Sequence, residues 1–370
     1  MRQLIISSAI LLSSFIGFSQ EYQFTDVVNL ECSDVKSQGN TGTCWSFSTS
    51  SFLESEIKRI TGKNIDLSEM YTVRNTYPKK AWNYVMRQGK AQFSEGGLAH
   101  DVLNSVADYG LVPESAFSGL GNDVTKHNHS ELIAVLKGML DVYISNPARQ
   151  LSPRWKSSIE AVLDIYLGKN VSTFQYNGKD YTPKSFQKMV KIKPSDYITL
   201  TSFTHQPFNT SFVLNIPDNF SNGSMYNVPL NDFETAIVSA LEKGYSVELD
   251  IDVSEKTFSS KNGVAIIPND INSIKESLTS IVKEKNITQD YRQQEFENYN
   301  TTDDHLMHIT GLAKDQNDTV YFKTKNSWGS DGDRVNYGGY VYISSAFIKL
   351  KAISVTLHKD ALPKQISNKL

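Results

Sequence analysis

Apolar residues recur at helical spacing through most of the first half of the chain. Between residues 44 and 60 they return every three or four positions, which predicts a helix that ends near Gly62. The stretch LSEMYTVRNTY predicts a second helix that begins behind Ser68, and GGLAHDVLNSVADYG predicts a third that stops at Gly110. Residues 130–168 predict two more helices. The N-terminal part of the chain is therefore expected to be mainly helical.

The second half of the chain alternates apolar and polar residues more often, as strands do. Asn177-Gly178 lies at the turn of a predicted hairpin, FQYNGKDY, and Asn231 is expected to cap the helix DFETAIVSALEKG. Residues 245–253 predict a strand, and residues 272–297 predict a charged helical segment. Four consecutive antiparallel strands are expected after it: HLMHITGLA, TVYFKTKNSW, GGYVYIS and AISVTLH. Helices first and strands last indicate an α+β protein with two lobes.

Length and composition are consistent with one large domain or two lobes, because 370 residues with 39% hydrophobic content can bury a sizeable core. The formal net charge of -3 does not favour a nucleic-acid or membrane-surface partner. The chain contains few histidines and only two cysteines, and the stretch HNH at 127–129 lacks further ligands nearby. We therefore expect neither a metal site nor a cofactor.

The first residues, MRQLIISSAILLSSFIGFSQ, combine a basic start with a mostly apolar run and small residues at its end. This pattern is typical of a secretory signal peptide over residues 1–19, with cleavage after about Ser19. The alternative is a membrane anchor, but the run is short for a bilayer span and is interrupted by serines. The mature chain, residues 20–370, is expected to be exported to the periplasm or the extracellular space, free of the membrane after cleavage.

Cys44 lies at the start of the first predicted helix, behind a glycine-containing loop. Helix N-termini carry positive potential and free N–H groups, and both favour a thiolate. A nucleophilic cysteine also needs a base and a group that holds an oxyanion. Gln38 can fold back so that its amide and the Cys44 backbone N–H point at one oxygen. The alternative for Cys44 is a buried, inert residue, which is the role we expect for Cys32; a disulfide between the two would silence the nucleophile.

The base is expected to be His305, which follows the polar run NTTDD and opens an apolar strand. Asn326, in KNSWG at the end of the next strand, can accept a hydrogen bond from the His305 ring and fix its orientation, and Trp328 can shield that contact from water. His308 is the rival, but it lies three residues further along the strand and should point to the opposite face of the sheet. Each signal alone is weak, whereas the ordered set is specific.

This set resembles the papain-like cysteine peptidases, whose nucleophile segment reads Cys-Gly-Ser/Ala-Cys-Trp/Tyr. Here the segment is TGTCW, so Thr41 stands where secreted members have a disulfide cysteine. The absent cysteine resembles the bleomycin hydrolase and aminopeptidase C branch. Cys44 and His305 are also 261 residues apart, against about 130–150 in papain-type enzymes. The excess fits a helical insertion of about 112–230, as that branch has.

The resemblance implies a papain-like two-lobed fold and a peptidase acting on peptide substrates without a cofactor. It implies roles for four residues: Cys44 as nucleophile, His305 as general acid and base, Asn326 as the residue that orients it, and Gln38 as oxyanion donor. Members of the branch often form hexamers, so a homo-oligomer is possible. The expected substrate-contacting groups, in addition, are Gly96, Gly97, Trp328 and the Leu370 carboxylate.

Aminopeptidase action is the function that this branch implies, and it requires a cleft that is blocked beyond the first substrate residue. In the branch the C-terminal tail supplies that block, so we expect the eleven residues after Lys359 to lie in the cleft with Leu370 as the anchor for the substrate ammonium. A short, basic tail leaves three alternatives: an endopeptidase with an open cleft, a transglutaminase-like or amidase-like acyl transferase, and an inactive binding protein. Asn326 and Gln38 argue against the acyl transferase, which usually has Asp in the third position.

Overall fold

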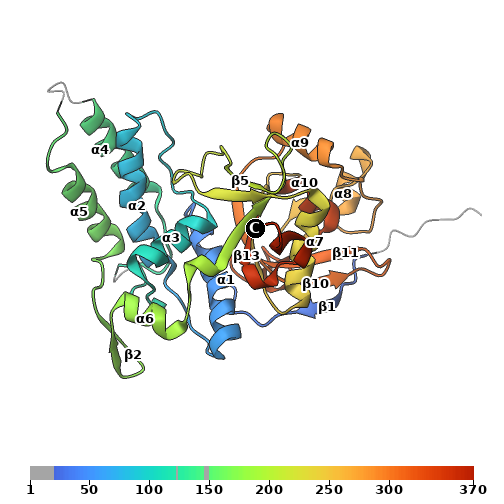
Figure 1. Cartoon of the computed structure of the whole chain (residues 1–370), viewed down its shortest axis with the longest axis horizontal. Helices are drawn as coiled ribbons and strands as arrows, with labels where there is room; N and C mark the ends of the chain where they lie inside the picture. The colour runs from blue at the N-terminus through green and yellow to red at the C-terminus, as the bar shows by residue number, and fades with distance from the viewer. Residues whose placement is uncertain (1–20, 122–123, 146–149) are drawn as a thin grey trace, which may run out of the picture.

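The computed structural model describes residues 21–121, 124–145 and 150–370. The signal peptide expected over residues 1–19 lies outside the described residues. Figure 1 shows a helical lobe on one side and a lobe built on a large sheet on the other, with α1 between them. This arrangement is the α+β, two-lobed fold expected from the order of helices and strands.

The helical lobe is built from the predicted helices, which end where local sequence signals end them. The Ser68 hydroxyl accepts a hydrogen bond from the backbone N–H of Tyr71 and so caps α2, while Gly62 ends α1 in the left-handed conformation with φ 71°. Asn177 and Gly178 form the turn of the predicted hairpin between β2 and β3. The elements of this lobe are α1 Cys44–Thr61, α2 Glu69–Met86, α3 Ala99–Tyr109, α4 Ser130–Ile144, α5 Trp155–Leu167, β2 Phe174–Tyr176, β3 Lys179–Tyr181 and α6 Pro183–Val190.

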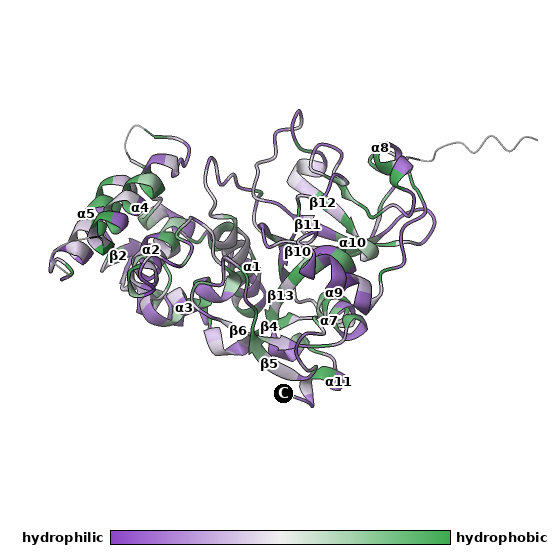
Figure 2. Cartoon of the chain, turned by 90° about the horizontal axis from the view of Figure 1, so that it is seen from above, coloured by the Kyte–Doolittle hydropathy of each residue, from purple (hydrophilic) through white to green (hydrophobic). Residues whose placement is uncertain are grey.

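The large sheet has the strand order β5-β6-β4-β13-β7-β10-β11-β12-β9-β8, and β1 pairs with the far end of β10. One face packs against α1 and the other against α7 and α10, so the sheet separates two hydrophobic cores (Figure 2). Its strands are β1 Thr25–Asn29, β4 Tyr197–Thr201, β5 Thr210–Val213, β6 Ser224–Asn227, β7 Val247–Ile251, β8 Phe258–Ser259, β9 Val264–Ala265, β10 His305–Lys314, β11 Val320–Lys325, β12 Tyr340–Ser344 and β13 Ala352–His358. The helices of this lobe are α7 Leu230–Glu242, α8 Ile274–Ser277, α9 Gln289–Glu297, α10 Ser345–Lys351 and α11 Lys364–Ser367.

The order of the last strands differs from the predicted run of four neighbours. β10, β11 and β12 are antiparallel neighbours, but β13 pairs with β7 and β4 instead of β12. The helix α10 carries the chain away from β12, and residues 352–357 are buried on both faces of the strand. A strand that is buried on both faces belongs in the interior of a sheet, and such a position cannot be read from hairpin spacing.

Three further expectations need local correction. α7 begins at Leu230 behind Pro229, so Asn231 lies inside the helix and does not cap it. The charged stretch of 272–297 forms two short helices, α8 and α9, joined by irregular chain. The segment of 112–230 contains the helices α4 to α6 and also the strands β4 to β6, which belong to the main sheet.

The C-terminal tail is folded against the sheet lobe and does not extend through a cleft. Ile366 of α11 is 1% exposed and packs in the core that contains α7. The Lys243 ammonium donates to the carbonyl oxygens of Ala361 and Leu362, and the Tyr226 hydroxyl donates to that of Lys369 at 2.9 Å. Figure 2 shows the chain end beside α11 and β5. An apolar residue in the tail thus finds a buried site on its own lobe.

The exposed Leu370 side chain follows this folded tail at the β6 edge of the sheet. Its expected role as the anchor in the cleft is therefore wrong for this structure. The correction follows from Ile366, because burying its side chain holds the tail on the sheet lobe.

A buried carboxyl group in the interface between α1 and the sheet makes stability depend on pH. Glu248 of β7 is completely buried and accepts a hydrogen bond from the Ser48 hydroxyl of α1 at 3.3 Å. Burial raises the pKa of Glu248 from 4.5 to about 8. The folded state therefore keeps this proton at a pH where the unfolded state has lost it. The free energy of unfolding falls, on this account, as pH rises from 4.5 to about 8.

Glu248→Gln removes this titration while keeping the shape of the side chain. We expect the variant to gain stability relative to the wild type as pH rises through that range, by up to about 1.4 kcal/mol per pH unit. Urea unfolding at several pH values measures the difference, with Glu242→Gln on the exposed side of α7 as control. A difference between Glu248→Gln and wild type that does not change with pH would contradict the assignment.

Candidate active site

Cys44 is the first residue of α1 and is 8% exposed. The loop that precedes it brings the chain from Gln38 through Gly42, whose backbone N–H donates to a carboxylate oxygen of Glu95 at 2.6 Å. The backbone N–H groups of Leu306 and Trp45 are directed at the Cys44 thiol and favour its ionised form. Because Leu306 directly follows the predicted base, α1 and β10 bring the thiol to the start of the strand that carries His305.

His305 opens β10 and is held from two sides. Its Nε2 lies 2.8 Å from Asn326 Oδ1, and the Trp328 ring lies against the imidazole with the ring centres 4.8 Å apart. Asn326 Oδ1 also accepts the backbone N–H of Ser327 at 2.7 Å, which fixes the orientation of the amide. The His305 Nε2 atom must therefore carry the hydrogen in this contact. In the neutral ring Nδ1 is then unprotonated and available to a proton from the thiol.

Burial keeps both partners neutral at rest. It raises the pKa of Cys44 to about 12, against the opposing effect of the Leu306 and Trp45 N–H groups. It lowers the pKa of His305 to about 4, although the hydrogen bond to Asn326 favours the charged ring. The helix N-terminus alone does not produce a thiolate here, because desolvation of the thiol is the larger effect. Transfer of the proton from Cys44 to His305 forms a pair with no net charge, which costs less in this buried place than either ion alone.

Gln38 is tied to the same loop that carries Asn326. Its backbone N–H donates to the Ser327 carbonyl oxygen at 2.8 Å, and its side-chain Oε1 accepts from the Ser327 hydroxyl at 2.6 Å. Its Nε2 donates to the Thr41 carbonyl oxygen at 2.6 Å. A side-chain amide has two N–H donors, so one remains for a substrate oxygen. Cys44, as the first helical residue, has a backbone N–H without an intrahelical acceptor, which supplies the second donor.

Gly96 and Gly97 lie beside the nucleophile helix, as expected for residues that border a cleft. The Trp45 ring nitrogen donates to the Glu95 carbonyl oxygen at 2.9 Å, and a Cβ on Gly97 would lie 3.1 Å from the Trp45 ring. A Cβ on Gly96 would lie 1.9 Å from a carboxylate oxygen of Asp218, so only glycine fits there. Sequence reasoning missed Asp218, because NIPDNF reads as an ordinary turn.

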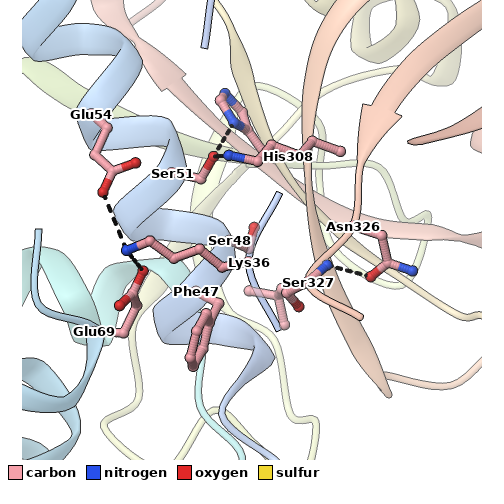
Figure 3. Close-up of a pocket in the computed structure, with 11 residues that line it drawn as sticks. Lys36, Phe47, Ser48, Ser51, Glu54, Glu69, His308, Asn326 and Ser327 are labelled. Atoms are coloured by element: carbon pink, nitrogen blue, oxygen red, sulfur yellow. Dashed lines mark hydrogen bonds and ion pairs between the residues drawn. The ribbon is translucent and has the colours of Figure 1, made fainter. Parts of the chain in front are cut away.

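His308 lies on the other face of β10 and belongs to a polar network under the site (Figure 3). Leu306 packs in the core beside α1, whereas Met307 packs in the core on the opposite face of the sheet, as strand alternation requires. His308 shares the face of Leu306, and its Nδ1 lies 2.9 Å from the Ser51 hydroxyl of α1. Burial and the charge of Lys325 hold the pKa of His308 well below its usual value. These contacts give His308 a structural role and confirm that it faces away from His305.

Both cysteines are free thiols, so no disulfide silences Cys44. Cys32 is half-buried rather than fully buried, and its sulfur lies 3.0 Å from the Tyr340 hydroxyl.

Two family models match the chain. The model described as Peptidase C1-like family matches residues 165–370, which is more than half of the chain, and the model described as Papain family cysteine protease matches residues 21–140. The first therefore covers His305 and Asn326, and the second covers Gln38 and Cys44.

Similar proteins extend over nearly the whole chain. Aminopeptidase G of Lactobacillus delbrueckii subsp. lactis is 23% identical over 90% of this chain and 83% of its own length. Aminopeptidase C of Listeria monocytogenes is 24% identical over 90% of this chain and 81% of its own length. Among solved structures, PepW from Lactobacillus rhamnosis HN001 superposes with a TM-score of 0.74 at 18% identity, covering 93% of this chain and 84% of that one. This last likeness concerns the fold.

The contact between His305 and Asn326 can be tested through the reactivity of the thiol. Asn326→Ala removes the acceptor that stabilises the protonated ring and fixes its tautomer. We expect the rate of Cys44 alkylation by iodoacetamide at neutral pH to fall roughly 10–10²-fold. Asn317→Ala, in the exposed turn between β10 and β11, is the matched control. Equal alkylation rates in the two variants would show that Asn326 does not support the proton transfer.

Proposed function

This chain belongs to the Peptidase C1-like family, and we propose that within it the protein is a cysteine-type aminopeptidase that removes N-terminal residues from peptides. The observation that carries the proposal is the pairing of His305 with Asn326 next to a thiol at a helix N-terminus. The names of the two aminopeptidases, each similar over 90% of this chain, support the exopeptidase part.

The reaction begins with the neutral pair. The Cys44 thiol gives its proton to His305 Nδ1 while its sulfur attacks the carbonyl carbon of the scissile peptide bond. The carbonyl oxygen becomes an oxyanion, which accepts hydrogen bonds from the Gln38 amide and the Cys44 backbone N–H. The protonated His305 then gives its proton to the leaving nitrogen, the C–N bond breaks, and a thioester on Cys44 remains.

Water completes the cycle. His305 takes a proton from the water as its oxygen attacks the thioester carbonyl, and the second oxyanion uses the same two donors. Collapse of this intermediate breaks the C–S bond and releases the N-terminal amino acid, while the proton returns from His305 to the Cys44 sulfur. Throughout, Asn326 keeps the hydrogen of His305 on Nε2, so that Nδ1 remains the atom that exchanges the proton.

A thiol-alkylating epoxide inhibitor and a substrate panel test this function. We expect labelling at Cys44, hydrolysis of aminoacyl amides with a free amine, and little hydrolysis of the same compounds with a blocked amine. Cys44→Ala should lose the label and at least about 10⁴-fold in kcat, and His305→Ala should lose similar activity. Hydrolysis of blocked peptides alone would indicate an endopeptidase, and an unlabelled, inactive wild type would indicate a binding protein.

Export is a separate part of the proposal. We propose that residues 1–19 act as a signal peptide, on the pattern of a basic start, an apolar run and small residues before the cleavage point. In the part of the chain that the structure describes, no helix has both the length and the apolar character that a membrane span requires. The homo-oligomer that the resemblance implies stays a prediction.

Expression of the full chain in a Gram-negative host with a C-terminal tag tests the export. We expect the tagged protein in the periplasm or medium, with the mass of a chain that lacks about the first 19 residues. Deletion of these residues should retain it in the cytoplasm. A full-length protein that stays in the cytoplasm would contradict the proposal.

A further inference from the structure

The loop between β5 and β6, residues 214–223, reaches from the sheet lobe to the helical lobe beside the nucleophile. Gln92 Nε2 donates to Asp218 Oδ1 at 2.9 Å, and the other Asp218 oxygen lies against Gly96, in the space that a side chain would fill. The Lys80 ammonium lies 5.0 Å from the centre of the Phe220 ring. β5 and its neighbours lie at the boundary of the two lobes (Figure 1). The loop therefore occupies the glycine-lined edge next to Cys44.

The loop is held in one conformation from inside. The Asn219 side chain donates to the carbonyl oxygens of Leu214 and Gly223, each at 3.0 Å, and accepts the Gly223 N–H at 2.7 Å. Leu214 is 1% exposed in the core of the helical lobe. The side chain of Asp218, between these anchors, is thus pre-organised and loses little freedom when it binds a ligand.

The charge around Asp218 is negative beyond what the nearby lysine neutralises. The negative charges of Asp218 and Asp303 both act on the Cys44 thiol. Asp303 stands two residues before His305, and its carboxyl oxygens are buried without a hydrogen-bond partner among the described residues. The buried Lys80 ammonium donates to the Gly96 carbonyl oxygen and faces several carboxylates, including Asp218 and Asp303. A small cation placed between the loop and Cys44 would balance this excess.

The N-terminal ammonium of a peptide fits this place. Its nitrogen lies about 2.5 Å from the carbonyl carbon of the first residue, which is the carbon that Cys44 attacks. An ammonium bound by Asp218 therefore puts the first peptide bond at the thiol. A longer N-terminal extension would meet the loop at Gly96. The tail that was expected to supply this block lies on the opposite side of the sheet lobe, against α7.

We propose that the loop of residues 214–223 closes the cleft beyond the first substrate residue and that Asp218 binds the substrate α-ammonium group. This inference rests on the proposed aminopeptidase function and assigns its specificity to a segment outside the nucleophile, base and oxyanion residues. Asp303, beside His305, is the second carboxyl group that faces the bound cation.

The test compares Asp218→Asn with the wild type on aminoacyl 7-amido-4-methylcoumarins that carry a free or an acetylated amine. We expect Asp218→Asn to lower kcat/KM for the free-amine substrates about 10–10²-fold, mainly through a higher KM, because a charge-assisted hydrogen bond is lost. Hydrolysis of the acetylated substrates should not fall. Asp108→Asn, on the exposed face of α3, is the matched control and should leave both activities unchanged. Asp218→Ala, which also frees the space at Gly96, should raise hydrolysis of the acetylated substrates.

Stoichiometric labelling of Cys44 in each variant confirms an intact site before the rates are compared. An unchanged rate on free-amine substrates, or an equal loss on both substrate types, would overturn the role of Asp218 while leaving the aminopeptidase function in place. A wild type that hydrolyses only acetylated substrates would instead overturn the function itself. The two failures are therefore distinguishable.

Discussion

The packing of α1 against the start of β10 is the contact on which the site depends. It places the thiol of Cys44 at the N–H of Leu306 and hence beside His305, although the two residues are far apart in the sequence. α1 is buried along most of its length between the two cores, so its first turn cannot shift without disturbing both lobes. The chemistry is thus positioned by hydrophobic packing, and the polar contacts at the site refine that position.

Burial has an electrostatic consequence as well as a mechanical one. It makes an isolated thiolate and an isolated imidazolium both unfavourable, so the resting site is neutral and the proton moves only when a partner can receive it. Beneath the site the same low-dielectric environment forces polar groups to pair. Lys36 bridges the buried carboxylates of Glu54 and Glu69, and Ser51 connects His308 with Lys325 (Figure 3). This network supports β11 just before Asn326, and it occupies His308 so that it does not compete as a base.

Two segments that differ little in outward character, the C-terminal tail and the β5–β6 loop, have exchanged the places expected of them. The tail carries Ile366, whose burial against the α7 core holds the chain end away from the catalytic cysteine. The loop carries Leu214 and Asn219, which anchor it from both ends and leave Asp218 at Gly96. In each case one buried side chain decides where a polar segment lies, because the segment itself has little apolar surface to bury.

Local chemistry made much of this protein legible in the sequence alone. Ser68, Gly62 and the Asn177-Gly178 turn bound their elements as predicted, since caps and turns involve only neighbouring residues. The ordered set of Gln38, Cys44, His305 and Asn326 identified the chemistry, because each residue type has a distinct task in acyl transfer. The sequence did not determine the sheet position of β13, the neutral state of Cys44 and His305, the fold of the tail or the place of Asp218. These depend on burial by segments distant in the chain, and only the tertiary structure brings those segments together.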